Sequence, residues 1–486
     1  MVLREISDLP GPRGLPLIGN AHQLLRVSRL HERGEQWARR YGPIVRVDIG
    51  RRRLVGISDP DEIHRILRER PDSFRRWRAQ EIVIREMDGM GPAGVFIAEG
   101  EEWKRQRRLV IGALNTNHLH RYFEVIRTST ERLHRRLMSA ARKGRPIEIS
   151  RELTSYTVDT ISALAFGHDL NTLERGEVEL QRHIQRIFRM TARRLAAPVP
   201  YWRWVRLPAD RALDRSVAAL NGAVDGFIEQ ARQRMAARPE LYEQPENLLE
   251  AMLAAQAQET DGAERRFTDR EISANARTIL SAGEDTTAHT LGWTIWLLAQ
   301  HPKAQERMAH EAREALGERS TAPDYETINA LSYSEAVLRE SMRLKTVGPL
   351  GTLEPLADTA ICNTRIPART PLLLLLRQAN LQQEPAPEFD PQRWLGESQT
   401  PASASLVFGA GPRFCPGRNL ALLEAKAALT MIARNFEIEL DESAGPVRER
   451  FNFAMVPDGL RVRLRRRTAA QPAPVGESGR EASAAR

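Results

Sequence analysis

The spacing of hydrophobic residues predicts helix through most of the middle of the chain. From about residue 101 to 345, apolar positions recur with helical periodicity, and NLALLEAKAALTMIARNF at 419–436 repeats the pattern. The stretches YGPIVRVDIG (41–50) and RRLVGISD (52–59) are β-branched and bounded by Gly and Asp, which predicts a hairpin. After 346 the pattern breaks into short strands such as RTPLLLLLRQA at 369–379. We therefore expect a mainly α fold with a minor β part.

The same pattern gives no sign of division into several domains. There is no internal repeat, and no linker separates one periodic stretch from the next. LPGPRGLPLIGN at 9–20 is too rich in Pro and Gly for a helix or a central strand. The final TAAQPAPVGESGREASAAR is poor in apolar residues. We expect a single domain over residues 1–466 and a disordered tail over 467–486.

Composition narrows the class of protein. Of 486 residues, 41% are hydrophobic and 28% charged, which is typical of a globular chain. The two cysteines, Cys362 and Cys415, cannot form a disulfide framework and fit a reducing compartment. The N-terminal MVLREISDLPGP has no apolar run of signal-peptide or anchor length. We therefore expect no membrane span and a cytoplasmic location.

The formal charge of +9 raises the question of nucleic-acid binding. Arginine is spread along the whole chain, and RERPDSFRRWRAQ at 68–80 is the densest patch. A nucleic-acid binder would concentrate this charge, so we expect no nucleic-acid partner. A solvated basic surface and a docking face for an acidic partner remain as alternatives.

The best-defined helix covers RFTDREISANARTILSAGEDTTAHTLGWTIWLLAQHP at 266–302. Thr268 and Glu271 form a capping box, and Pro302 marks the end. The helix is apolar nearly all round, so it should run through the core. Its middle, AGEDTT at 282–287, is a poor helix former.

The use of such a poor helix former in the middle of a helix suggests that AGEDTT has a functional role. Ala282 and Gly283 would let something flat approach the backbone closely. Thr286 lies one turn after Ala282, whose carbonyl its hydroxyl can reach, and Asp285 places an acid beside it. A kinked core helix with a solvated acid pair explains the same residues.

The loop FGAGPRFCPG at 408–417 surrounds Cys415 with turn residues. A metal-binding cysteine must be a thiolate, whose charge Arg413, the loop amides and the start of helix 419–436 can compensate. One thiolate cannot make a structural zinc site, whereas an axial haem ligand needs only one. Gly417 would permit close approach to a flat ligand. A buried structural cysteine is the alternative.

Three further residues could form a buried charge cluster. Glu340 and Arg343 are three residues apart on a predicted helix, and Arg393 lies in the irregular EFDPQRWL at 388–395. An ordinary surface pair explains Glu340 and Arg343 equally well.

Taken together, these motifs resemble the cytochrome P450 family. The loop 408–417 resembles its haem-binding signature, AGEDTT its oxygen-activation motif, and Glu340, Arg343 and Arg393 its buried triad. EEWKRQRRL at 101–109 resembles the helix that reaches the haem propionates. The likeness runs in order from about residue 9 to 465. It implies the P450 fold, with haem b between a long central helix and the cysteine loop.

The resemblance also implies a role for each matching residue. Cys415 would be the iron ligand and Phe408 would shield its sulfur. Asp285 and Thr286 would be catalytic, as a proton relay to the distal oxygen. The residues implied to bind the cofactor are Trp103, Arg107, Ala282, Gly283, Phe408, Arg413, Cys415 and Gly417. His289 is expected to be a core packing residue.

One feature departs from the family pattern. Many members carry a propionate-binding arginine on a strand where this chain has Leu353 or Glu354. The propionates would then depend more on Arg107 and Arg413.

The implied function is that of a monooxygenase. It would insert one atom of dioxygen into an apolar molecule, by hydroxylation or epoxidation of a terpenoid, fatty acid, polyketide or steroid. Electrons would come from a separate ferredoxin or flavodoxin-type donor with its reductase. The alternatives are a peroxide-driven or isomerising haem-thiolate enzyme and a non-catalytic haem protein.

Overall fold

The computed structural model describes most of the chain between residues 3 and 467. Arg467 is held by a hydrogen bond from its amide to the Asn435 carbonyl oxygen at 2.9 Å. The rest of the predicted tail lies outside the described residues, as do 1–2, 25, 51, 88–92, 115, 177–178, 198, 259–266, 383–387 and 396–404; only the backbone is described for 116–119 and 196.

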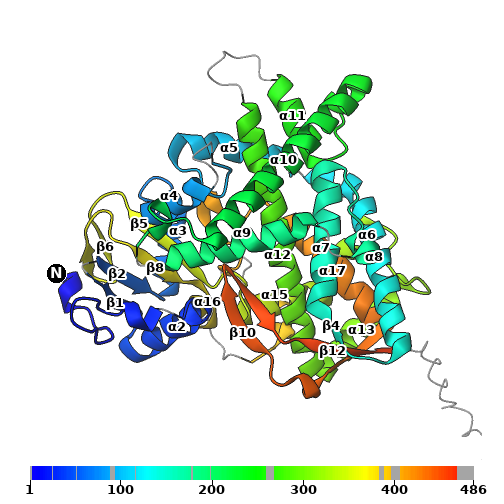
Figure 1. The fold of residues 1–486 in the computed structure, drawn as a ribbon. Helices are drawn as coiled ribbons and strands as arrows, with labels where there is room; N and C mark the ends of the chain where they lie inside the picture. Colours follow the sequence, from blue (N-terminus) through cyan, green and yellow to red (C-terminus); the bar gives the residue numbers. More distant parts are fainter. Residues whose placement is uncertain are drawn as a thin grey trace, which may run out of the picture.

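Helices account for most of the described structure, as the periodicity predicts (Figure 1). The longer ones are α2 (Leu30–Tyr41), α3 (Pro60–Arg68), α4 (Arg78–Met87), α5 (Gly100–Ala113), α6 (Thr116–Lys143), α7 (Ile149–Phe166), α9 (Glu179–Ala196), α10 (Pro208–Ala237), α11 (Leu248–Gln258), α12 (Asp269–Gln300), α13 (Pro302–Leu316), α15 (Ser332–Leu344) and α17 (Arg418–Asn435). Shorter ones are α1 (Ala21–Leu24), α8 (Thr172–Arg175), α14 (Tyr325–Asn329) and α16 (Leu376–Gln382).

The central helix α12 begins and ends where the sequence predicts. The Thr268 side chain accepts a hydrogen bond from the Glu271 amide, and the Glu271 carboxylate accepts one from the Thr268 amide at 2.8 Å. This is the predicted capping box. The helix runs without a break to Gln300, and Pro302 opens α13. In Figure 1, α12 passes through the middle of the molecule.

The largest sheet joins strands from the N-terminal part of the chain to strands between residues 350 and 375. Its order is β1 (Ile44–Ile49), β2 (Arg52–Ile57), β8 (Leu372–Leu375), β5 (Leu350–Pro355) and β3 (Phe74–Arg76). β1 and β2 form the predicted hairpin, with Ile44 opposite Ile57. The predicted strand at 369–379 is only partly correct, because β8 ends at Leu375 and α16 follows directly.

Three smaller sheets complete the described β part. The β4–β12–β9 sheet lies at the helical end of the molecule, whereas the five-stranded sheet lies at the opposite end in Figure 1. The small strands are β4 (Ile147–Glu148), β9 (Phe436–Leu440) and β12 (Arg461–Arg466), the hairpin β10 (Arg448–Asn452) and β11 (Ala454–Asp458), and the pair β6 (Thr359–Ile361) and β7 (Thr364–Ile366).

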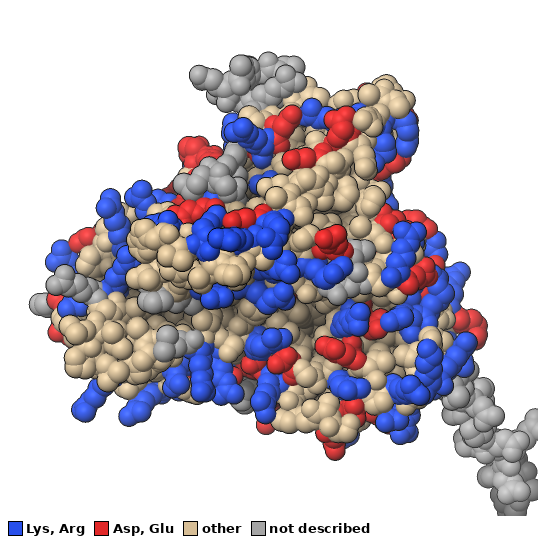
Figure 2. All heavy atoms as spheres, viewed as in Figure 1, with Lys and Arg blue, Asp and Glu red and all other residues tan. Residues whose placement is uncertain are grey.

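The basic residues do not gather into one patch on the face shown in Figure 2. Lys and Arg spread over the whole face, with Asp and Glu between them. The dense patch at 68–80 is not simply a solvated surface, because Arg70 and Arg76 are both buried, each 8% exposed. Within the described part of the chain, no helix combines the length and apolarity needed to cross a bilayer.

Candidate active site

The cysteine loop is a tight turn built on α3. Gly409 and Gly411 have φ angles of 73° and 68°, in the left-handed region that favours glycine. A Cβ on Gly411 would lie 2.4 Å from the Leu67 carbonyl oxygen, so only glycine permits this approach to α3. The Cys415 amide donates to the Phe408 carbonyl oxygen at 2.8 Å, which closes the loop.

Positive charge and a backbone hydrogen bond around Cys415 favour its thiolate, against the effect of burial. Burial raises the pKa of the Cys415 thiol, while a hydrogen bond from the Gly417 backbone and the Arg107 and Arg418 guanidiniums oppose that rise. A Cβ on Gly417 would meet only the Cys415 sulfur, at 3.9 Å. Gly417 thus keeps the space beside the sulfur open for a flat ligand.

One stretch of α12 is exposed although the helix is otherwise largely buried. Ala282 and Thr286 are both exposed, whereas the neighbouring Thr287 and Ala288 are buried. Because this part of α12 lies in the core, their exposure marks a hollow inside the molecule. The Thr286 hydroxyl donates to the Ala282 carbonyl oxygen at 2.8 Å, as predicted.

Gly283 lies on another side of α12 from this hollow. A Cβ there would come 2.7 Å from Cγ1 of Ile161 on α7. The glycine therefore allows two helices to pack closely, which is a different use from the expected approach of a flat ligand.

Asp285 has a partner in His289, which was expected to be a core packing residue. The His289 Nε2 lies 3.8 Å from the Asp285 Oδ1, one turn along the helix. Burial raises the pKa of Asp285, against the charges of His289 and Arg189. Burial also lowers the pKa of His289, which Asp285 partly opposes. The i to i+4 spacing was visible in the sequence, but the burial of His289 and the partial burial of Asp285 were not.

Trp103 and Arg107 of α5 both point into the protein. Trp103 is 5% exposed, and the Arg413 guanidinium lies over its ring at 4.9 Å from the centroid. The Arg107 guanidinium lies 4.7 Å from the Phe414 ring centroid. Its Nε and one terminal nitrogen are buried without a hydrogen-bond partner among the described residues.

The predicted triad forms as expected. The Glu340 carboxylate accepts from Arg343 at 2.8 and 2.9 Å and from Arg393 at 3.0 Å. The Trp394 indole donates to the same carboxylate at 2.9 Å. Glu340 is fully buried, so the surface-pair alternative is excluded.

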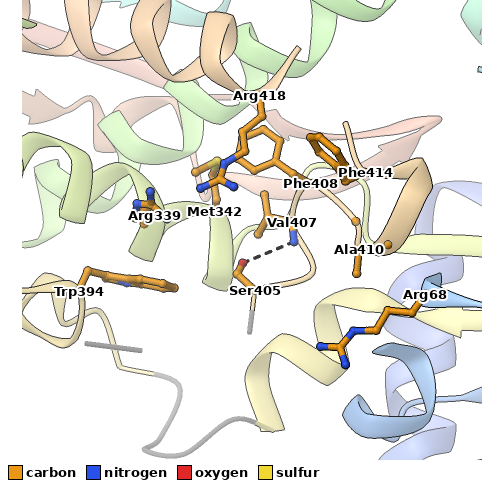
Figure 3. Close-up of a pocket in the computed structure, with 12 residues that line it drawn as sticks. Arg68, Arg339, Met342, Trp394, Ser405, Val407, Phe408, Ala410, Phe414 and Arg418 are labelled. Carbon is orange, nitrogen blue, oxygen red and sulfur yellow. Dashed lines mark hydrogen bonds between the residues drawn. The ribbon is translucent and has the colours of Figure 1, made fainter. Parts of the chain in front are cut away.

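A cavity of about 220 Å³ opens beside the cysteine loop (Figure 3). Phe408, Ala410 and Phe414 of the loop line it, together with Met342 and Trp394 from the triad region. Three arginines also line it, from α3, α15 and the start of α17: Arg68, Arg339 and Arg418.

The sequence model of the cytochrome P450 family matches residues 9–464. The chain belongs to the cytochrome P450 family. Human and mouse mitochondrial 25-hydroxyvitamin D-1 alpha hydroxylases are 30% and 29% identical to this P450, each over 94% of its chain and 91% and 92% of their own. The chloroplastic protein LUTEIN DEFICIENT 5 of Arabidopsis thaliana is 25% identical, over 88% of this chain and 73% of its own.

Membership establishes the class of enzyme and the cofactor. The protein is a cytochrome P450 monooxygenase of mainly α fold, and its cofactor is haem b. The residues present fit that group, because the Cys415 sulfur has an open space beside it and Arg107 has unpartnered buried nitrogens. Both features suit a flat macrocycle with an axial thiolate and anionic substituents.

A buried arginine cluster near Glu99 fits the cofactor further. The Glu99 carboxylate pairs with Arg70 at 2.5 Å and with Arg413 at 2.8 Å, and accepts from the Arg76 amide at 3.2 Å. It is the one carboxylate paired with Arg70 or Arg413 in the described ranges. Burial and mutual repulsion lower the pKa of Arg76 and Arg413. The P450 interior thus holds excess positive charge, which suits two propionates.

One arginine of this cluster lies near Leu353, where this chain lacks the propionate-binding arginine of many family members. Leu353 on β5 is paired with Arg76 on β3, so the two side chains project to the same face of the sheet. Arg76 therefore places a positive charge beside the position at which many P450s carry a propionate-binding arginine. This role of Arg76 cannot be predicted from local sequence, because the pairing of β3 with β5 joins segments about 280 residues apart.

The expectation of a cytoplasmic location was wrong. The relatives at 29% and 30% identity are named mitochondrial, and another relative is named chloroplastic. The expectation rested on the lack of an apolar N-terminal run. Such a run inserts a chain into a membrane, and its absence does not distinguish one aqueous compartment from another.

Proposed function

We propose that this P450 inserts one atom of dioxygen into an apolar small molecule and reduces the other to water. Two electrons from a separate carrier and two protons balance the reaction. The observation that carries the proposal is the exposed Ala282–Thr286 face of α12, with the half-buried acid Asp285 beside it. Binding of haem alone does not require a hydroxyl and an acid at that position.

We assign the cofactor to residues from three segments, which are the cysteine loop, α5 and β3. Cys415 would hold the iron, and Arg107, Arg413 and Trp103, with Arg76, would hold the propionates. Haem b bound in this way supplies the activation of dioxygen. Gly417 would keep the thiolate face open, and the Gly417 amide and Arg107 would stabilise the thiolate charge.

Thr286 and Asp285 would deliver the protons that the reaction consumes. Because the Thr286 hydroxyl donates to Ala282, its oxygen lone pairs are directed to accept a hydrogen bond from water in the hollow. The raised pKa of Asp285 increases the share of its protonated form near neutral pH. His289 and Arg189 would set how readily Asp285 gives up that proton.

The variant Thr286→Ala tests this assignment. We expect it to bind substrate and consume electrons, but to convert about 10-fold less substrate and to release peroxide instead. Thr290→Ala is the matched control, because Thr290 makes the same bond one turn later, to the Thr286 carbonyl oxygen at 2.8 Å. Unchanged coupling in Thr286→Ala would contradict the proposal. Turnover with peroxide but not with dioxygen and reductant would favour a peroxide-driven enzyme.

For the substrate we propose an apolar polycyclic or isoprenoid molecule of steroid or terpenoid type. The relatives named as vitamin D hydroxylases support this class. Fatty acids and polyketides are the competing classes. A Soret titration of the ferric holoenzyme with one representative of each class distinguishes them, because a saturable shift identifies the ligand that displaces iron-bound water.

For the electron donor we propose an acidic ferredoxin or flavodoxin-type protein. Support comes from the cavity beside the cysteine loop, because Arg68, Arg339 and Arg418 line it together with Phe408 and Phe414 of the loop (Figure 3). Positive charge around the shortest route to the iron would steer an acidic carrier to this face.

The variant Arg68→Glu tests the docking face. Arg68 is exposed on α3, whose neighbour Leu67 contacts the loop at Gly411. We expect the rate of reduction by an acidic ferredoxin to fall about 10-fold at low salt, and the difference to shrink at high salt. Arg215→Glu, on the exposed surface of α10, is the control. Equal effects of the two variants would contradict docking at this face.

A further inference from the structure

Glu99 stands at the start of α5, but its side chain does not serve that helix. It is the N-cap residue of α5, and its carboxylate makes no capping hydrogen bond with the described first-turn amides. An acid at this position can stabilise its own helix through those amides and the helix dipole. The Glu99 side chain is 10% exposed and turns to arginines of other segments instead. This carboxylate is therefore used for something other than capping.

Three arginines converge on the Glu99 carboxylate. Its Oε1 accepts a hydrogen bond from the Arg70 guanidinium at 2.5 Å and one from the Arg76 amide at 3.2 Å. Its Oε2 forms an ion pair with Nη1 of Arg413 at 2.8 Å. Arg70 follows α3, Arg76 ends β3, and Arg413 belongs to the cysteine loop. Glu99 is thus the acid that joins these segments beside the cofactor site.

The surroundings of Glu99 hold more positive charge than it can offset. The side chains of Arg70, Arg76, Arg107 and Arg413 are all buried. Burial, together with repulsion from Arg70, lowers the pKa of Arg76 and of Arg413 to about 9, and the charge of Glu99 opposes the fall in both. Glu99 therefore already acts on the charge of this part of the interior.

The haem propionates would add to the charge of Glu99. Arg76, Arg107 and Arg413 are the arginines assigned to the propionates, and Arg413 contacts Glu99 as well. Two propionates and Glu99 would supply three negative charges against the four guanidinium charges. Without the Glu99 charge the ratio would be two to four. Such a difference acts more strongly in the protein interior than in water, because the dielectric screening is weaker there.

We propose that Glu99 sets the reduction potential of the haem by offsetting the charges of Arg70 and Arg413. The inference rests on the proposed function, because it takes the propionates to lie at these arginines. Ferrous haem holds one electron more than ferric haem, so positive charge around it favours the ferrous form. Glu99 lowers that preference and makes the haem harder to reduce by its electron donor. It acts through the two arginines and is therefore a positioning residue.

The variant Glu99→Gln tests the proposal, because it removes the charge and keeps the shape. The measurement is a potentiometric titration of the ferric–ferrous couple in the holoenzyme, followed by Soret absorbance. Neither dioxygen nor turnover is involved. We expect the equilibrium to shift about 10-fold toward ferrous haem, which is a rise of about 59 mV for a one-electron couple.

The sign of the shift separates charge from structural support. Arg70→Met breaks the same ion pair from its positive side and touches no residue assigned to the iron. We expect it to shift the equilibrium by a comparable factor in the opposite direction, toward ferric haem. A structural role alone would move both variants the same way, since both lose the same contact. Should Glu99→Gln lose haem, the direction in Arg70→Met decides alone.

Two control variants complete the test. Glu99→Asp keeps the charge and should return the potential toward that of the wild type. Glu101→Gln removes a carboxylate from the same turn of α5, where the side chain is 86% exposed and pairs with Lys104. Because solvent screens that carboxylate, we expect the equilibrium to change less than about twofold.

Four results would overturn the inference. They are a shift of less than about twofold in Glu99→Gln, shifts of the same sign in Glu99→Gln and Arg70→Met, equal potentials in Glu99→Asp and Glu99→Gln, and an equal effect of Glu101→Gln. The proposed function fails by other measurements, which are unchanged coupling in Thr286→Ala or a wild type without the thiolate-type band after reduction with CO. The two failures are therefore distinguishable.

Discussion

Buried arginines give the interior of the site its positive charge. Arg70, Arg76 and Arg413 surround Glu99, and the Arg107 guanidinium of α5 lies over the ring of Phe414, the residue before Cys415. Desolvating this many like charges costs free energy in the absence of a compensating anion. The cluster therefore makes sense as a site prepared for the carboxylates of the cofactor.

Replacing Arg76 by Met should separate cofactor retention from folding. We expect the rate of haem transfer to excess apomyoglobin to rise about fivefold, because one charge facing the propionates is lost. The stability of the haem-free protein should stay the same or rise by about 1 kcal/mol, since a buried charge is removed. Arg75→Met is the control, because Arg75 alternates to the other face of β3 and pairs with Glu81. Unchanged haem retention in Arg76→Met would contradict the account.

Gly283→Ala tests why glycine stands in the middle of α12. Helix propensity alone would stabilise this change by about 1 kcal/mol. The new Cβ would however overlap Ile161 at 2.7 Å, and we expect a net loss of about 1–3 kcal/mol in urea unfolding. Gly226→Ala on α10 has no atom within 4 Å of the new Cβ and should stabilise the protein. Two stabilising changes would show that α7 and α12 do not pack as described.

At the scale of single residues, the local sequence predicted the structural role of some residues but not of others. Gly409 and Gly411 could be assigned to a turn because their spacing around Cys415 is local. The contact of Gly283 with Ile161 depends on how two distant helices pack, and the role of Arg76 depends on strand pairing. The partnership of His289 with Asp285 needed burial, since exposed pairs of that spacing contribute little.

The elements around the N-terminal part are joined by an ion network centred on Glu449 of β10. Its carboxylate pairs with Arg377 at 2.7 Å, Lys345 at 2.5 Å and His31 at 3.2 Å. Arg377 also pairs with Glu35 of α2 at 2.6 Å. Strand β10 is thereby fixed to α2, α16 and the end of α15.

This network predicts a defined response to acid. Burial alone would raise the pKa of Glu449, but the hydrogen bond from His31 and the charges of Arg377 and Lys345 hold that pKa well below its usual range. A carboxyl with a depressed folded-state pKa stabilises the fold above its unfolded pKa of about 4.3 and loses that contribution as pH falls. Glu449→Gln should therefore cost about 3 kcal/mol at pH 7.

The cost of Glu449→Gln should shrink steadily below about pH 4, because this carboxyl then takes up a proton in the unfolded protein while it stays ionised in the folded one. Urea unfolding at a series of pH values measures both proteins. A cost that does not depend on pH would show that packing, and not charge, accounts for the effect.

The types of the secondary-structure elements were largely predictable from the sequence. The stretch 369–379 divides into β8 and α16, because an apolar run alone does not distinguish a strand from a buried helix.

Over the whole molecule, the order of the motifs carried more information than any one of them. Each motif had an ordinary alternative, and their sequence from about residue 9 to 465 led to the family that the comparison established for 9–464. The mainly α architecture followed from periodicity. The cellular compartment could not be predicted in this way, because composition does not distinguish one aqueous compartment from another.

We propose that residues 1–466 form a single folding unit. Support comes from the five-stranded sheet, which joins β1 near the N-terminus to β8, and from α12, which packs against helices from several parts of the chain. Thermal unfolding of the holoenzyme should show one transition by both circular dichroism and Soret absorbance. Two separated transitions by circular dichroism would contradict a single unit.

The central claim is that Cys415 is the iron ligand, and one spectrum tests it most directly. Reduced protein with CO is compared for the wild type, Cys415→Ser and Cys362→Ser. Cys362 is the matched control, because burial raises the pKa of its thiol to about 12 and it lies outside the cysteine loop. We expect the thiolate-type Soret band in the wild type and Cys362→Ser, and its loss in Cys415→Ser. A thiolate-type band that persists in Cys415→Ser would contradict the account.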